Sequence, residues 1–156
     1  MEAYVALLHY FYSFFGGLED EISVDIVTCY LSDYADRKKT WLLEHDILSC
    51  GGSLPLKTPK SDLPEISNAI HAMGALYVIE GSSLGGQIIS KIITKQLGFN
   101  DEHHLRYFIG YGSQTEEMWV RFKKSINNIP ENRAPELIQA ANDTFLKFKD
   151  WIEKTG

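Results

Sequence analysis

The sequence has few cysteines and no excess of basic residues. It contains two cysteines, Cys29 and Cys50, among 156 residues, and their spacing matches no metal-binding or redox motif. We expect two buried thiols, as in a cytoplasmic protein, with a disulfide between them as the alternative. Acidic side chains outnumber basic ones by 21 to 15, giving a net charge of -6. This balance disfavours a nucleic-acid partner.

Long apolar runs and common catalytic motifs are also missing. No apolar run is long enough to span a bilayer, and the N-terminus has no basic leader, so we expect neither a membrane partner nor a signal peptide. There is no phosphate-binding loop, no His-Glu-x-x-His motif and no pair of Glu-x-x-His motifs. Ser82 and Ser83 have no strand-turn-helix elbow around them, which argues against a serine nucleophile.

The pattern of apolar residues predicts an all-α protein with a single domain over residues 1–156. No segment alternates as a strand would, and apolar residues recur at helical spacing. The expected helices cover residues 1–15, a continuation over 18–31 broken near Ser23, 33–49, 64–97, 113–129 and 135–156. Gly16 and Gly17 should end the first helix and Gly98 the longest one.

Two further expectations concern individual positions. Ser32 or Asp33 can cap the third helix, and most of Arg37, Lys38 and Lys39 should reach water. Pro64 suits the first turn of the longest helix.

The longest predicted helix carries a cluster of small residues in its interior. Gly74, Gly81 and Gly85 share one face at seven- and four-residue steps. Each interior glycine costs about 1 kcal/mol relative to alanine. The residues 81–86, GSSLGG, therefore suggest that a flat or bulky ligand lies against the bare backbone, or that the helix bends there. A tight crossing of two helices is the alternative.

Residues 74–87, GALYVIEGSSLGGQ, resemble the distal-helix motif of heme (haem) oxygenases, closest to the bacterial, biliverdin-producing type often found beside phytochromes. Weaker matches at 4–18, 36–47, 111–119 and around Phe145 extend the likeness over nearly the whole chain. The resemblance implies a helical bundle that holds heme between two helices. The proximal helix carries the histidine that ligates iron, and the kinked distal helix brings its backbone close to the iron-bound oxygen.

The resemblance also implies a reaction and a set of site residues. Heme is both cofactor and substrate in the family, and electrons from a reductase or ferredoxin carry it to biliverdin, iron and carbon monoxide. Ser82 stands near where some relatives have an aspartate that organises distal water. The heme-binding residues implied are Tyr77, Gly81, Ser82, Gly85, Gly86, Arg121, Lys123, Lys124 and Phe145. Of these, the three cations are candidates for the propionates, with a solvated basic face as the alternative, and Phe145 for packing on the ring.

One departure from the family leaves two functions open. The family's proximal histidine lies upstream of the segment that begins here at Met1, so we expect that helix to be absent. We assign no histidine to the iron, and His9 is the nearest candidate. The chain is therefore either a heme-degrading monooxygenase or a related, non-catalytic binding protein that has lost the proximal ligand. The second function includes a possible homodimer that covers the apolar residues 1–15.

Overall fold

The computed structural model describes residues 1–37 and 39–156, and within these two ranges it contains helices and no strand. The all-α class predicted from the sequence is confirmed. The α-helices are α1 (Glu2–Glu21), α2 (Val24–Val27), α3 (Trp41–Ser49), α4 (Ala69–Leu97), α5 (Arg106–Ile109), α6 (Thr115–Ile126) and α7 (Ala134–Thr155). Short 3-10 turns η1 (Tyr34–Asp36), η2 (Lys60–Asp62), η3 (Gly112–Gln114) and η4 (Glu131–Arg133) connect them.

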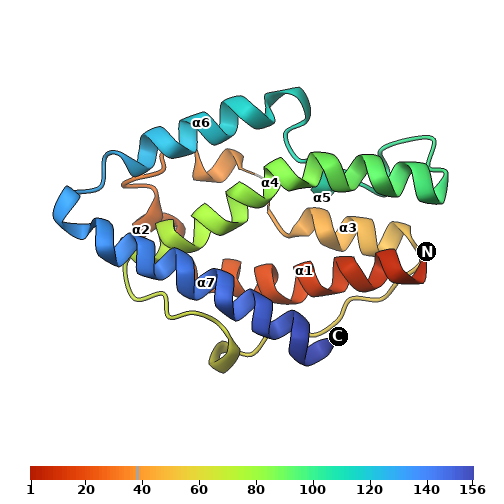
Figure 1. Cartoon of the computed structure of the whole chain (residues 1–156), viewed down its shortest axis with the longest axis horizontal. Helices are drawn as coiled ribbons and strands as arrows, with labels where there is room; N and C mark the ends of the chain where they lie inside the picture. The colour runs from red at the N-terminus through yellow and green to blue at the C-terminus, as the bar shows by residue number, and fades with distance from the viewer. Residues whose placement is uncertain (38) are drawn as a thin grey trace.

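Helix α4 runs through the middle of the bundle and contacts most of the other helices. Figure 1 shows α6 along the N-terminal half of α4, while α7 crosses that half and continues over α1. Helix α5 packs against the C-terminal half of α4. None of the described helices has both the length and the apolar character needed to cross a membrane.

Helix α1 continues through the two glycines that were expected to end it. The segment that follows α3 lies close against this part of α1, and the Thr58 amide donates to the Ser13 carbonyl at 2.9 Å. A Cβ at Gly17 would lie 3.0 Å from the Thr58 carbonyl oxygen. The two glycines therefore allow close packing within a helix, and the predicted break near Ser23 occurs just after the helix ends at Glu21.

Two predicted helix starts are wrong for local reasons. Helix α3 begins at Trp41 rather than near Asp33, because the chain forms the turn η1 and becomes extended at Arg37. Helix α4 begins at Ala69 rather than Pro64, because the Asn68 side chain caps it by accepting from the His71 amide at 2.9 Å. Its predicted end is confirmed, since Gly98 closes it with a φ of 67°.

Aromatic side chains fill the core between α1 and α7. The Phe148 ring of α7 lies 4.8 to 5.3 Å from the ring centroids of Phe11, Phe14 and Phe15. Tyr4, Leu8, Phe14, Phe15 and Leu18 of α1 are buried. Because the rest of the chain covers α1, residues 1–15 do not form the exposed apolar strip that the homodimer was expected to cover.

Two of the glycines of α4 are required by close helix packing. A Cβ at Gly74 would lie 2.5 Å from the Cβ of Ala140 on α7, and a Cβ at Gly86 would lie 2.6 Å from the carbonyl oxygen of Phe108 on α5. Neither gap admits a methyl group without moving a helix. For Gly74 and Gly86, the alternative explanation given for the glycines, a tight crossing of two helices, is therefore correct.

The two cysteines are free thiols, as expected, but neither is fully buried. Cys29 is exposed and Cys50 is half-buried. The expectation of buried thiols is therefore wrong, because Cys29 lies in the short turn after α2, where the chain is at the surface.

The contact of Gly86 with α5 predicts a loss of stability on substitution. In Gly86→Ala the added methyl group should push α4 away from Phe108 and lower the free energy of unfolding by about 1–3 kcal/mol. Urea denaturation followed by circular dichroism measures this change. An unchanged midpoint would show that α4 and α5 are not in close contact.

Candidate functional site

The remaining two glycines of the expected heme-facing surface are not used for helix packing. A Cβ at Gly85 would meet nothing within 4 Å, and a Cβ at Gly81 would meet only the indole of Trp119, at the ordinary contact distance of 3.5 Å. Both positions lie inside a long helix, where glycine is unfavourable. Since packing does not require glycine at either position, a bound group is the better explanation for its presence.

A cavity of about 400 Å³ lies beside Gly81, between α1, α4 and α7. Its size is within the range of pockets that bind small molecules and cofactors. The residues that line it are Phe11 and Phe15 of α1, Tyr77, Val78, Gly81 and Ser82 of α4, and Ala141, Asn142, Phe145 and Phe148 of α7. The walls are therefore mostly aromatic and aliphatic carbon, which suits a flat apolar ring.

The structure brings together four of the residues that the sequence implied for heme binding. Tyr77, Gly81, Ser82 and Phe145 all line the cavity. The exposure of Tyr77 (43%) and Phe145 (60%) shows that their rings reach its open side. Gly85 lies one turn beyond Gly81 on the exposed surface of α4.

The other implied residues lie outside the cavity. Gly86 packs against α5 instead. Arg121, Lys123 and Lys124 are exposed on α6 and do not line the cavity. The Arg121 guanidinium pairs with Glu117 at 2.6 Å. The Lys123 Nζ atom lies 5.9 Å from the centroid of the Trp119 ring, which contacts the Cβ position of Gly81.

No histidine is among the described residues that line the cavity. His9 is on α1, and its Nε2 atom is buried without a hydrogen-bond partner among the described residues. The residues present therefore fit the ring of a heme, through the bare backbone and the aromatic walls, but they include no imidazole for its iron.

Ser82 connects the cavity to a buried tyrosine. Its Oγ donates to the Ile79 carbonyl oxygen at 2.5 Å. Burial raises the pKa of Tyr107, and a hydrogen bond with Ser82 opposes this effect only in part. A neutral phenol therefore lies next to Ser82, which together with Tyr77 supplies the hydroxyl groups among the residues that line the cavity.

A buried ionic network lies directly before Gly81 in α4. The Glu80 carboxylate is 3.1 Å from Arg37 Nη1, and it accepts from the Tyr111 hydroxyl at 2.9 Å. Arg37 also pairs with Asp33 at 2.9 Å. Burial favours a lower pKa for Arg37, but the hydrogen bond to Asp33 and the charge of Glu80 outweigh it and raise that pKa.

The network corrects one expectation from the sequence and decides another. Arg37 was expected to reach water, yet it is 2% exposed. Glu80, which the sequence left open between a buried and a solvated position, is also 2% exposed. Lys39 is half-buried and lies over the Tyr34 ring at 3.6 Å, while Lys38 lies outside the described residues. Only the weak clue of a charge next to the glycine motif could have singled out Glu80.

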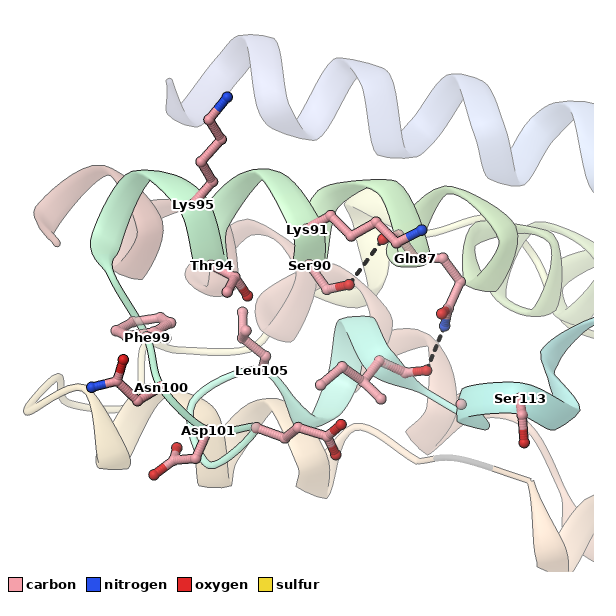
Figure 2. Close-up of a pocket in the computed structure, with 13 residues that line it drawn as sticks. Gln87, Ser90, Lys91, Thr94, Lys95, Phe99, Asn100, Asp101, Leu105 and Ser113 are labelled. Atoms are coloured by element: carbon pink, nitrogen blue, oxygen red, sulfur yellow. Dashed lines mark hydrogen bonds between the residues drawn. The ribbon is translucent and has the colours of Figure 1, made fainter.

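A larger cavity, of about 580 Å³, lies on another face of α4 and is chemically different. Figure 2 shows Gln87, Ser90 and Thr94 of α4 facing the segment that contains Phe99 and Leu105. Lysines and carboxylates line this groove together, including Lys91, Lys95, Asp101 and Glu102. A mixed polar lining suits a large apolar ring poorly, so the smaller cavity is the better candidate for a heme-binding site.

These features define an all-α protein with an apolar cavity beside the glycines of its central helix. The family model "Heme oxygenase" matches residues 59–154, more than half of the chain. The chain is also 30% identical over 150 residues to a heme oxygenase of Xanthomonas campestris pv. campestris (strain 8004), an alignment that covers 94% of this chain and 87% of the relative. No solved structure matches the chain. The protein belongs to the heme oxygenase family, which confirms the resemblance carried by residues 74–87.

Buried tyrosines predict a loss of stability in alkali. Burial raises the pKa of Tyr4, Tyr34 and Tyr107 in the folded chain above the ordinary tyrosine value of about 10. A raised pKa contributes stability that is complete below about pH 10 and is lost as the pH rises, since the unfolded chain releases these protons first. The free energy of unfolding should fall above about pH 10, and more gently in Tyr107→Phe. Equal slopes for both proteins would contradict the burial of this phenol.

Proposed function

We propose that this protein binds heme in the cavity beside Gly81 and degrades it to biliverdin, iron and carbon monoxide. Membership of the heme oxygenase family supports the reaction. The observation that carries the choice of site is the open backbone at Gly85, together with a cavity walled by aromatic side chains at Gly81. Bound heme would supply the iron that activates oxygen and would itself be the substrate.

The chain's own residues would orient the ring and exclude water from one of its faces. The backbone at Gly85 would lie against the ring because no atom of another described element lies within 4 Å of its Cβ position, and beside Gly81 the ring would meet the Trp119 indole. Phe145 and Tyr77 would pack on its exposed part. Ser82, which lines the cavity, would hold a water molecule by its hydroxyl group, although a hydroxyl group supplies no negative charge.

The iron ligand is proposed to come from outside the residues that line the cavity. Iron in heme enzymes takes an axial donor such as histidine, cysteinate, methionine or tyrosinate. His9 stays a candidate within this chain, although it is not among the residues that line the cavity. His9→Ala, which removes this imidazole, is the variant that tests its ligation through the hemin spectrum.

The remaining proposals concern partners and location. Lys123 and Lys124 are proposed to meet the propionates or an external electron donor, a reductase or a ferredoxin, because both are exposed on α6 and Lys123 lies over the Trp119 ring. A homodimer is proposed through the exposed Leu84, Ile88 and Ile92 of α4, which replace residues 1–15 as the uncovered apolar strip. The free thiols of Cys29 and Cys50 support a cytoplasmic location.

A single substitution separates heme binding from stability. Gly85→Leu places a side chain into open space in the unliganded protein, so the free energy of unfolding should not fall, and the better helix propensity should raise it by up to about 1 kcal/mol. The same side chain should occupy the place of the ring and raise the hemin dissociation constant at least about tenfold, a loss of about 1.4 kcal/mol. Absorbance titration with hemin measures the affinity, and addition of a reductant then tests for biliverdin.

The control is Ala3→Leu, which adds leucine at an exposed position of α1 away from the cavity. It should leave hemin affinity unchanged. If Gly85→Leu binds hemin as tightly as the unmodified protein, the proposed site is wrong. Hemin binding without biliverdin would instead support the non-catalytic binding protein.

A further inference from the structure

Arg37 is buried at the junction of α4, α6 and the turn η1, and every part of its guanidinium group is engaged. Nε and Nη2 pair with Asp33, and Nη1 pairs with Glu80. Both Nη atoms also donate to the carbonyl oxygen of Met118, each at 3.2 Å. The side chain thus connects the central helix to the backbone of α6.

The carbonyl group that Arg37 binds on α6 belongs to the residue before Trp119, and Trp119 lies next to Gly81 of the cavity wall. Met118 precedes Trp119, whose indole is the only group near the Cβ position of Gly81 among the described residues. Trp119 stacks on Phe122 with ring centroids 5.8 Å apart and planes 12° apart. The Phe122 ring lies 5.6 Å from Arg37 Cζ. Arg37 therefore contacts both the backbone before Trp119 and the ring on which Trp119 stacks.

The indole is also fixed from the side of α4. The Tyr77 ring, which lines the cavity, lies 5.3 Å from the Trp119 ring. The Trp119 ring, which contacts Tyr77 and Phe122, therefore forms a wall beside Gly81, whereas the next turn of α4, at Gly85, is open. The glycine face of α4 is thus covered by Trp119 at Gly81 and uncovered at Gly85.

We infer that Arg37 is a positioning residue for heme, an inference that rests on the proposed function. It holds Trp119 against Gly81 through the Met118 carbonyl and the Phe122 ring, and Trp119 is one edge of the heme slot. This edge limits how far the ring can move over Gly81 toward α6. Lysine cannot replace arginine here, because one ammonium group cannot pair with Glu80 and Asp33 and also make two hydrogen bonds to the same carbonyl.

The position of Trp119 can be tested without heme. In a protein that carries Trp41→Phe and Trp151→Phe, Trp119 is the sole tryptophan, and quenching of its fluorescence by acrylamide reports its exposure. Arg37→Lys should raise the quenching constant about twofold, because the indole is released from Gly81. Arg133→Lys, which alters an arginine paired with Glu136 at the start of α7, is the matched control and should not change it. Equal quenching in the parent and in Arg37→Lys would overturn the inference, whether or not hemin binds.

A double-mutant cycle then tests whether Arg37 affects hemin binding through Trp119. Hemin dissociation constants are measured for the parent protein, Arg37→Lys, Trp119→Phe and the double variant, each shown to be folded by circular dichroism. If Arg37 acts through Trp119, Arg37→Lys should weaken binding about tenfold when Trp119 is present and less than about twofold in the Trp119→Phe background. The same factor in both backgrounds would contradict the role of Trp119 as an edge. Absence of hemin binding in the parent would overturn the proposed function and, with it, this inference about heme, while the quenching result on Trp119 would stand.

Discussion

The close approach of neighbouring groups to the bare backbone of α4 is the constraint on which the structure depends. Gly74 and Gly86 let the helix meet α7 and α5 at distances that exclude a methyl group. Gly81 and Gly85 lie between them and meet no such contact, although each interior glycine costs about 1 kcal/mol. Close packing offsets this cost at Gly74 and Gly86. At Gly81 and Gly85 about 2 kcal/mol stays without compensation. That difference is the physical argument for a ligand, and the heme oxygenase family supplies its identity.

The buried charges before Gly81 complement this arrangement. Taking Arg37 and Glu80 out of water is costly, and a buried ion pair often adds little net stability compared with apolar side chains of similar size. The geometric effect of this ion pair is clearer, because Arg37 bonds to Asp33 beside the turn η1, to Glu80 of α4 and to the Met118 carbonyl of α6. Breaking it would leave a buried charge alone, so these elements keep a fixed relation beside the cavity.

Much of the fold and part of the site were predictable from the sequence. Helical periodicity indicated the all-α class, Gly98 marked the end of α4, and residues 74–87 carried the family resemblance. Contacts between distant residues explain the failures. The continuation of α1 through Gly17 depends on the segment around Thr58, and the burial of Arg37 depends on Glu80, 43 positions away. The division of the glycines into packing and open positions likewise depends on α5 and α7, which local sequence does not place.

The most direct measurement of the heme-facing role of α4 uses selective 15N labelling of glycine. The twelve glycines give a sparse amide spectrum, in which the paramagnetic iron of bound hemin broadens the signals of nearby residues. The amide signals of Gly81 and Gly85 should broaden most on addition of hemin, while those of Gly51 and Gly52, in the turn after α3, stay sharp. Broadening at Gly51 and Gly52 with unchanged signals from Gly81 and Gly85 would show that heme lies elsewhere and would contradict the account.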